Sequence, residues 1–264
     1  MSSSVAKRTP AEALRPFITE YVFRTVKVPV VKAMPLRYLS SIDFFLGADF
    51  ETTDHRTGEL LPFSRCSIRG PRTFRKSAIR IEKDFVSFVI RFKPTGLYGL
   101  LGISAHLFRD EAIDGALVLP ALFPEITERL MACKDIDSCI AVVEPYLLVL
   151  AKKASYTSVG VDQMVKLVMA SSAKTSINAL QQKVCLSQRQ LERNFVKEIG
   201  TTPKLYSRMV RFSNMLQHKM HHTDTKWSGL AYEFDYADQM HLIKDFQHFL
   251  GVSPGDFVAE DFAF

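Results

Sequence analysis

Three basic side chains stand four residues apart in one stretch of the chain, at Arg189, Arg193 and Lys197. If this stretch is helical, all three lie on one face, because side chains at i and i+4 are neighbours on a helix. An arginine can form two hydrogen bonds to the edge of guanine, and a glutamine can do the same with adenine. The chemistry that these residue types could perform is therefore recognition of the edges of bases in a DNA groove.

The residues around these basic side chains have the pattern of a helix with two distinct faces. Ser187 is a typical N-cap residue, and Leu191, Phe195 and Ile199 are apolar at the spacing of one helical face. The basic side chains lie on the opposite face. We expect a helix that follows Ser187 and runs to about Ile199, with one side anchored in a core and the other free to contact DNA.

The sequence contains two copies of this arrangement, at Ser176 to Gly200 and at Trp227 to Gly251. Each copy reads as a short helix, a turn and a second helix, and a proline follows each closing glycine by three residues. The pattern predicts two helix-turn-helix units. Two recognition helices about one DNA turn apart, roughly 34 Å, could enter successive major grooves.

A set of polar residues on these helices and on the segment between them is expected to contact DNA. We expect Arg189, Arg193 and Gln239 to read bases, and His241 and Lys244 to contact either bases or phosphates. The full set is Ser187, Gln188, Arg189, Gln190, Arg193, Lys197, Lys204, Arg208, Gln239, Met240, His241 and Lys244. The simpler alternative is that these are ordinary solvated helix residues, but their doubled arrangement favours contact with DNA.

A long helix is expected between the two units. Thr202 and Pro203 are typical of an N-cap and a first helical turn, and apolar residues recur at helical spacing from Leu205 to Met220. The net charge of +6 lies mostly in residues 1–100, and residues 160–264 are nearly neutral. Basic residues nevertheless predominate locally on this connecting helix and the first unit, as contact with phosphates requires.

His218, His221 and His222 form a dense cluster near the end of this helix. A metal site is one interpretation, but no cysteine or carboxylate stands at a convincing ligand spacing. We therefore expect a polar connection between the two units, with no metal and no cofactor.

The N-terminal half has the pattern of a β-rich domain. Short runs of β-branched and aromatic residues, at 38–46, 78–81 and 85–92, are separated by turn residues such as Gly47. Several short strands with regular turns predict a small barrel or sandwich. Residues 11–26 are expected to begin as a helix and pass into a strand.

Helices are expected at 97–101, 121–133 and 137–153. The apolar stripes of the last two either cover the β domain or form a dimer seam. We favour covering, because apolar stripes are usually part of a core.

The length of the chain, 264 residues, favours two domains. The predicted fold class is α+β, with a small β-barrel domain with flanking helices followed by an all-α domain. We expect a disordered tail at 1–10, a sensor or dimerisation domain at 11–155, and a DNA-binding domain at 156–264. A stretch rich in serine and small residues, 154–160, is the candidate linker.

The N-terminal half lacks the residues of the common catalytic sites. Barrel enzymes usually hold a metal through several histidines, and residues 1–160 contain only His55 and His106. No G-x-S-x-G motif, glycine-rich phosphate loop or Cys/His pair is present. We expect no enzymatic activity and no catalytic residues. The aromatics Phe44, Phe88 and Phe92 either line a ligand pocket or fill a core, with the core favoured; the sequence identifies no ligand-binding residues.

The cysteines and apolar stretches favour a cytoplasmic protein. Cys66, Cys133, Cys139 and Cys185 form no C-x-x-C pair, and no secretory segment precedes them, so reduced thiols are expected. The longest apolar stretches are too short to span a bilayer, and no membrane partner is expected.

The motifs of both units resemble those of a known family. The closing segment carries Asp238, Gln239, His241, Lys244, Phe246, Phe249, Gly251, Ser253, Pro254 and Phe257, and the first unit carries Leu186, Ser187, Arg189, Leu191, Arg193, Phe195, Gly200 and Pro203. Over about the last 90 residues the chain resembles the AraC/XylS family of bacterial transcription regulators. The N-terminal half is more weakly similar to cupin-like sensor domains, through Leu14–Phe17, Gly70-Pro71 and the segment from Phe92 to Gly96.

This resemblance implies a regulator that binds promoter DNA and recruits or blocks RNA polymerase. It also implies that a small-molecule effector or a homodimer contact in the cupin-like domain modulates binding. Two alternatives remain from the residues: a low-specificity architectural DNA-binding protein, or a ligand-binding protein whose helical domain mediates protein contacts.

The sequence departs from the family pattern in both helix-helix turns and in the second recognition helix. Cys185 and Asp235 stand where the family usually has glycine, and Asp tolerates a left-handed backbone better than Cys does. Lys244 stands where arginine is more usual, and a lysine lacks the planar fork that binds two acceptors at once.

Overall fold

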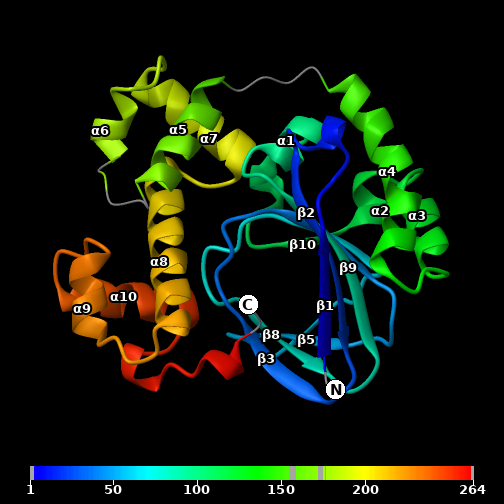
Figure 1. The fold of residues 1–264 in the computed structure, drawn as a ribbon, viewed down its shortest axis with the longest axis horizontal. Coiled ribbons are helices and arrows are strands. Elements are labelled where there is room, and N and C mark those ends of the chain that lie inside the picture. The colour runs from blue at the N-terminus through cyan, green and yellow to red at the C-terminus, as the bar shows by residue number, and fades with distance from the viewer. Residues whose placement is uncertain (1–2, 155–158, 172–174, 176, 263–264) are drawn as a thin grey trace.

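The computed structural model of the chain describes residues 3–154, 159–171, 175 and 177–262. An N-terminal β-rich domain is followed by a helical domain, as the α+β prediction required. In Figure 1 the helical domain lies on one side of the β-sheets, and the helices α3 (Phe123–Leu130) and α4 (Ile136–Lys153) lie on the other.

The N-terminal domain contains two antiparallel sheets. The larger has the order β1 (Ser3–Arg8), β2 (Ile18–Val26), β9 (Phe85–Phe92), β4 (Ser41–Phe45), β7 (Cys66–Arg69) and β10 (Ala112–Asp114). The smaller has the order β3 (Val30–Met34), β8 (Ser77–Ile81), β5 (Glu51–Asp54) and β6 (Leu60–Leu61). The strands predicted within 38–46, 78–81 and 85–92 are confirmed as β4, β8 and β9.

The prediction of a disordered tail at 1–10 is wrong for residues 3–8, which form β1. This strand pairs with β2 along its whole length, and the hydroxyl oxygens of Ser4 and Thr25 lie 2.8 Å apart. Most of these residues are polar, so their composition alone does not predict a strand. The pairing is explained by β2, which would otherwise present an unpaired edge of backbone groups.

The alternation of side chains along the larger sheet separates two environments. On β9, Phe88 and Phe92 are fully buried in the core beneath the covering helices, together with Phe44 from β4. Ser87 and Arg91 of the same strand line a cavity between the two sheets. The interpretation of Phe44, Phe88 and Phe92 as core residues is therefore confirmed.

Three helices complete the core on the outer face of the larger sheet. The helix α1 (Gly96–Leu101) follows β9, and α3 and α4 place Leu130, Val143 and Leu147 in the same core as the sheet. These side chains are at most 2% exposed. The interpretation that the apolar stripes cover the β domain is confirmed.

The helical domain has two cores that share one helix. The first unit comprises α5 (Val159–Ala170), α6 (Ile177–Gln181) and α7 (Gln188–Ile199), and the second comprises α9 (Trp227–Glu233) and α10 (Gln239–Leu250). The helix α8 (Pro203–His221) lies between them (Figure 1). Tyr206 and Val210 of α8 pack in the first core, and Met209 and Phe212 pack in the second.

Two predicted boundaries fall partly on residues that are not described. Of the candidate linker at 154–160, residues 155–158 lie outside the described residues, and α5 already includes Gly160. The expected start of the first unit at Ser176 also lies outside them, and α6 begins at Ile177.

The turn between α9 and α10 places a non-glycine residue in the left-handed region. Asp235 has φ +57°, whereas Cys185, at the equivalent place in the first unit, is not among the residues with positive φ. The Arg211 guanidinium donates a hydrogen bond of 3.1 Å to the Asp235 carbonyl and lies over the Tyr236 ring. A short polar residue tolerates this conformation, and the contacts from α8 hold it in place.

Replacing Leu147 with alanine tests the covering role of α4. Leu147→Ala should lower the free energy of unfolding by about 2–5 kcal/mol, because it opens a cavity in the core. Val149→Ala, on the same helix but 52% exposed, is the matched control and should change it by less than about 0.5 kcal/mol. Urea unfolding followed by circular dichroism measures both; equal effects would contradict the packing described for α4.

Substitution at Asp235 tests the left-handed turn. Asp235→Val should cost about 1–2 kcal/mol, because a β-branched side chain is strained at positive φ. Asp235→Gly should be tolerated, since glycine adopts this conformation freely. The same unfolding measurement applies, and a valine variant as stable as the glycine variant would contradict the conformation.

Candidate nucleic-acid interface

The first recognition helix, α7, begins with a complete capping box. The Ser187 hydroxyl accepts a hydrogen bond of 3.3 Å from the Gln190 backbone N–H, and Gln190 Oε1 accepts one of 3.2 Å from the Ser187 backbone N–H. Both side chains were predicted to contact DNA, and the structure uses them first to fix the start of the helix. The cap defines where the exposed residues Gln188, Arg189 and Arg193 project.

The C-terminal end of α7 contacts the N-terminal domain. Lys197 Nζ lies 5.2 Å from the centre of the Tyr98 ring, and the Lys197 carbonyl accepts a hydrogen bond of 3.3 Å from the Ser104 hydroxyl. Gly200, which ends the helix at φ +90°, packs against the Ala105 carbonyl so closely that a Cβ atom would lie 2.9 Å from it. The ammonium group of Lys197 is thus placed at the domain contact.

The second recognition helix, α10, also has a side-chain cap at its start, without the reciprocal bond of a capping box. Asp238 is the N-cap and accepts a hydrogen bond of 2.8 Å from the His241 backbone N–H. Gln239, Met240, His241 and Lys244 are all exposed. The structure therefore brings the predicted residues of this unit onto one free surface.

The two predicted basic residues of α8 have different surroundings. Lys204 is exposed in the first turn of the helix. Arg208 donates a hydrogen bond of 2.5 Å to Asp245, whose side chain is only 6% exposed, and its guanidinium lies over the Phe249 ring. Arg208 thus links α8 to α10, and a role in contacting DNA remains a prediction.

The partner of Arg208 was missed in the sequence. Asp245 stands between the apolar residues Leu242 and Phe246 on the buried face of α10, where a carboxylate needs a partner. It also accepts a hydrogen bond of 3.2 Å from the Tyr236 hydroxyl. Burial and the Asp245 carboxylate raise the pKa of Tyr236, which keeps that hydroxyl protonated as a donor. A carboxylate inside an apolar stripe was the available signal.

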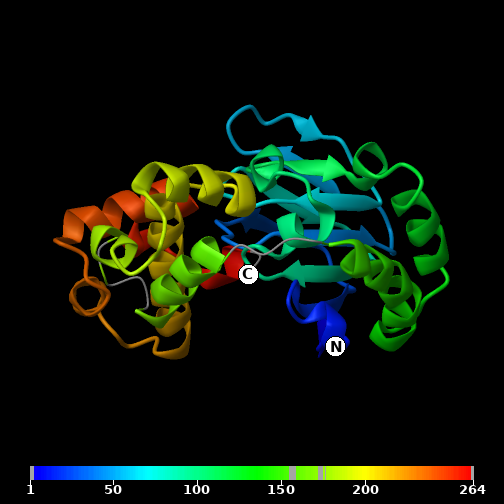
Figure 2. The ribbon, with the colours of Figure 1, turned by 90° about the horizontal axis from the view of Figure 1, so that it is seen from above.

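Both recognition helices run toward the N-terminal domain (Figure 1, Figure 2). At the end of α10 the Leu250 carbonyl accepts a hydrogen bond of 3.4 Å from Arg75, and beyond it the Glu260 carbonyl accepts one of 2.7 Å from Lys32. The ends that touch the N-terminal domain are therefore the C-terminal ends. The N-terminal halves, which carry Arg189 and Gln239, point away from it.

Further contacts between the domains were not predicted either. The Thr95 hydroxyl donates a hydrogen bond of 2.6 Å to Asp162 at the start of α5, and Ala33 of β3 forms a parallel bridge with Phe262. Burial and the nearby Arg208 lower the pKa of His248 on α10, although Asp245 opposes that shift. The contacts of Thr95 with Asp162 and of Ala33 with Phe262 join residues far apart in the chain, so neither segment alone indicates them.

The histidine cluster lies at the end of α8. The rings of His218 and His222 are 4.5 Å apart, and His218 Nε2 lies 3.8 Å from Glu233 Oε2. In the part of the chain that the structure describes, no group of three His, Cys, Asp or Glu residues is arranged to hold a metal ion. Likewise, none of the described helices has the length and hydropathy needed to cross a membrane.

Comparison with known proteins identifies the helical domain. Residues 180–260 match the model of a family described as a helix-turn-helix domain. A comparison with curated proteins finds no match.

Several solved structures are similar to the whole chain at low sequence identity. An apo variant of ToxT from Vibrio cholerae is 10% identical with a TM-score of 0.48, over 97% of this chain and 96% of its own. ToxT from Vibrio cholerae with a bound unsaturated fatty acid is 10% identical with a TM-score of 0.44, over 96% and 93%. The AraC-like transcriptional activator CuxR is 12% identical with a TM-score of 0.30, over 97% and 82%. At these values the similarity is no evidence of a shared ligand.

The matched segment begins in α6 and ends in the short 3-10 helix η4 (Ala259–Asp261), so it contains both recognition helices. Its two capped helices carry the motifs noted in the sequence, and both units pack against α8, which we call the strut. The C-terminal part of the chain therefore contains a helix-turn-helix domain, and residues 180–260 match the model of that domain.

Proposed function

We propose that the protein regulates transcription by binding promoter DNA with sequence preference, placing α7 and α10 in successive major grooves. The observation that carries this proposal is the placement of two capped helices on one shared strut, with their N-terminal halves exposed and directed away from the N-terminal domain. The proposal assigns the chain no catalytic role.

The strut supports the proposal because it fixes the distance between the two helices. Successive residues of α8 belong to different cores, so neither unit can rotate without removing apolar side chains from its own core. A rigid pair of helices can match two grooves about 34 Å apart without a large loss of conformational entropy on binding.

The starts of the helices supply contacts to phosphate that need no particular side chain. Backbone N–H groups in the first turn of a helix bind anions, and the helix dipole favours them. The first turns of α7, α8 and α10 are exposed at Gln188, Lys204 and Gln239. These contacts would set the position of the protein on the duplex, and Arg189, Arg193 and Gln239 would read bases.

The N-terminal domain supports a role in controlling DNA binding. A cavity of about 540 Å³ lies between its two sheets, and this volume is in the range of small-molecule sites. From the volume of this cavity and its position between the sheets, we infer that a small molecule occupies it. A homodimer contact through the same domain, an interaction with RNA polymerase and action in the cytoplasm complete the proposal.

Selection from random duplex DNA tests sequence preference directly. The full chain should enrich a site with two conserved blocks about ten base pairs apart, because each recognition helix reads one major groove. The affinity of the enriched site is then measured by fluorescence anisotropy at two salt concentrations. Binding that shows no enriched motif and collapses in salt would replace the proposal with an architectural role.

Single substitutions separate base reading from phosphate contact. Arg193→Ala should weaken binding to the selected site by about ten- to a hundredfold and relax preference at one position. Lys204→Ala should weaken all sequences alike and reduce the slope of log affinity against log salt by about one.

Arg80→Ala is the matched control for both, because Arg80 is exposed on β8 of the N-terminal domain and its loss changes the net charge equally. Circular dichroism must show that each variant is folded. If Arg193→Ala and Arg80→Ala bind the selected site equally well, α7 does not read bases.

A further inference from the structure

The cavity between the two sheets has an unusual charge balance. Its lining includes five arginines, Arg24, Arg37, Arg69, Arg72 and Arg91, and Asp43 is the one carboxylate among the described residues that line it. The Arg91 guanidinium has a partner outside the cavity, since it donates a hydrogen bond of 2.7 Å to Glu20. Burying cations without matching anions is costly, so this cluster calls for an explanation.

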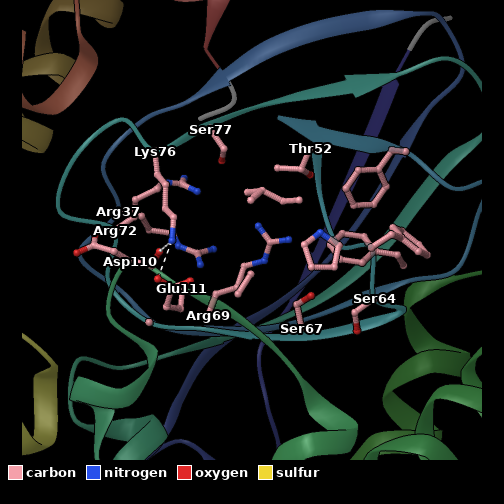
Figure 3. Close-up of a pocket in the computed structure, with 17 residues that line it drawn as sticks. Arg37, Thr52, Ser64, Ser67, Arg69, Arg72, Lys76, Ser77, Asp110 and Glu111 are labelled. Carbon is pink, nitrogen blue, oxygen red and sulfur yellow. Dashed lines mark hydrogen bonds and ion pairs between the residues drawn. The ribbon is translucent and has the colours of Figure 1, made fainter. Parts of the chain in front are cut away.

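Three of these arginines stand between this cavity and a smaller one. Arg37, Arg69 and Arg72 also line an adjoining cavity of about 170 Å³, and Figure 3 shows them there with Ser67. Arg37 and Arg72 face each other in an antiparallel bridge, in which each backbone N–H donates to the other's carbonyl. The main chain therefore fixes these two side chains next to each other.

The hydrogen-bond acceptors around the three guanidinium groups are few. Arg72 Nε donates a hydrogen bond of 2.5 Å to the Pro35 carbonyl. Arg69 Nε lies 3.1 Å from Asp43 Oδ2, which is within ion-pair distance but without hydrogen-bond geometry. Arg37 Nε is buried and has no hydrogen-bond partner among the described residues.

Arg37 remains charged in spite of its burial. Burial lowers the pKa of Arg37 to about 10, and the cations of Arg69 and Arg91 act in the same direction while Asp43 opposes them. Burial, Arg37 and Arg69 lower the pKa of Arg72 well below its usual value, while Asp43 and Asp110 oppose that shift. At neutral pH Arg37 is therefore still protonated, and its Nε has no hydrogen-bond partner among the described residues.

Asp43 and Asp110 offset part of this charge, but Asp110 already accepts two hydrogen bonds from Thr73, so the three arginines share few free acceptors. The larger cavity also has an apolar wall, formed by Val22, Val26, Ile79, Ile81 and Phe85. A cationic end beside an apolar chamber is complementary to a molecule with an oxyanion head and an apolar body. Arginine is well suited to such a head, because its planar group binds carboxylate or phosphate oxygens in pairs.

We propose, building on the regulatory function above, that the N-terminal domain binds an organic oxyanion, with its carboxylate or phosphate head held by Arg37, Arg69 and Arg72 and its apolar body in the larger cavity. The oxyanion supplies hydrogen-bond acceptors that these guanidinium groups lack, as at Arg37 Nε. Nothing in the apolar walls favours one particular body, so the head group defines the ligand class.

The two segments that contain Arg37 and Arg72 also contact the helical domain. Leu36 packs in the second core with α8 and α10, and the Tyr38 ring meets the Tyr206 ring of α8 edge-on at 5.9 Å. Arg75, three residues after Arg72, donates to the carbonyl at the end of α10. A ligand that shifts the segments of Arg37 and Arg72 therefore acts on residues that contact both units of the helical domain.

The space for such a movement lies between the domains. A third cavity of about 230 Å³ is lined by Arg37 and Arg72 on one side and by Ser213, Leu216 and Met220 of α8 on the other. Because both binding events involve this junction, the ligand should change the affinity for DNA, and DNA should change the affinity for the ligand by the same factor.

The test begins with the full wild-type chain without DNA. A panel of straight-chain and aryl-substituted carboxylates, the matching alkyl phosphates and the matching neutral amides is titrated by calorimetry and by thermal unfolding. Carboxylates or phosphates should bind and raise the melting temperature, whereas the amides should not. Comparing the carboxylates with the phosphates shows which head group is preferred. Inorganic phosphate alone should bind much more weakly, because it leaves the apolar chamber unfilled.

Arg37→Met then tests the assigned head-group site. The substitution should weaken binding of the best oxyanion by about tenfold or more. The stability of the free variant should be unchanged or higher, since a buried cation without a partner is removed. Arg80→Met, which removes an exposed arginine from the same sheet as β3, is the matched control and should bind like the wild type.

Three outcomes would overturn the proposal: no panel member binds, the amides bind as well as the oxyanions, or Arg37→Met binds the best oxyanion as tightly as Arg80→Met. The first two need no variant and hold even if Arg37→Met fails to fold. The regulatory part is measured separately, as a ligand-dependent change in DNA affinity at fixed salt that Arg37→Met loses. DNA binding without ligand and ligand binding without DNA can each fail alone, so the failure of this site is distinguishable from the failure of the proposed function.

Discussion

The helical domain depends on one constraint, which is that α8 buries two faces in two different cores. Tyr206 and Val210 belong to the first core, and Met209 and Phe212 belong to the second. Neighbouring positions on a helix point about 100° apart, so the two cores must lie at a fixed angle around the same axis. The hydrogen bond from Arg208 to the buried Asp245 adds a directional contact between α8 and α10. A pair of recognition helices held in this way can enter two grooves of DNA as a single rigid body.

Features that arise from neighbouring residues could be predicted from the sequence. The caps at Ser187 and Thr202 form within three residues, and each has a distinct residue signature. Asp235 takes the left-handed conformation expected of a glycine substitute in a turn. In the N-terminal half, alternating residues and turn glycines predicted the strands β4, β8 and β9, because these signals are also local.

The arginine cluster could not be predicted, because both faces of the larger sheet are covered. Phe88 and its neighbours face the helices, whereas Ser87 and Arg91 face the second sheet, so alternation does not indicate which side is solvent. Arg37 and Arg72 meet only through an isolated bridge across 35 positions, which has no signature in either segment. The signal available was a charged residue at inward positions of otherwise apolar strands, at Asp43 and Arg69.

The position of these arginines also explains how a cavity in one domain can act on helices in the other. A ligand can shift a conformational equilibrium only by the difference between its affinities for the two states. Charged groups removed from water interact more strongly than exposed ones, so a small displacement of Arg37 or Arg72 changes the binding free energy appreciably. Both residues sit in segments whose neighbours, Tyr38 and Arg75, touch the helical domain. Burying these cations lowers the stability of the fold. The same burial creates a site whose occupancy affects the DNA-binding helices.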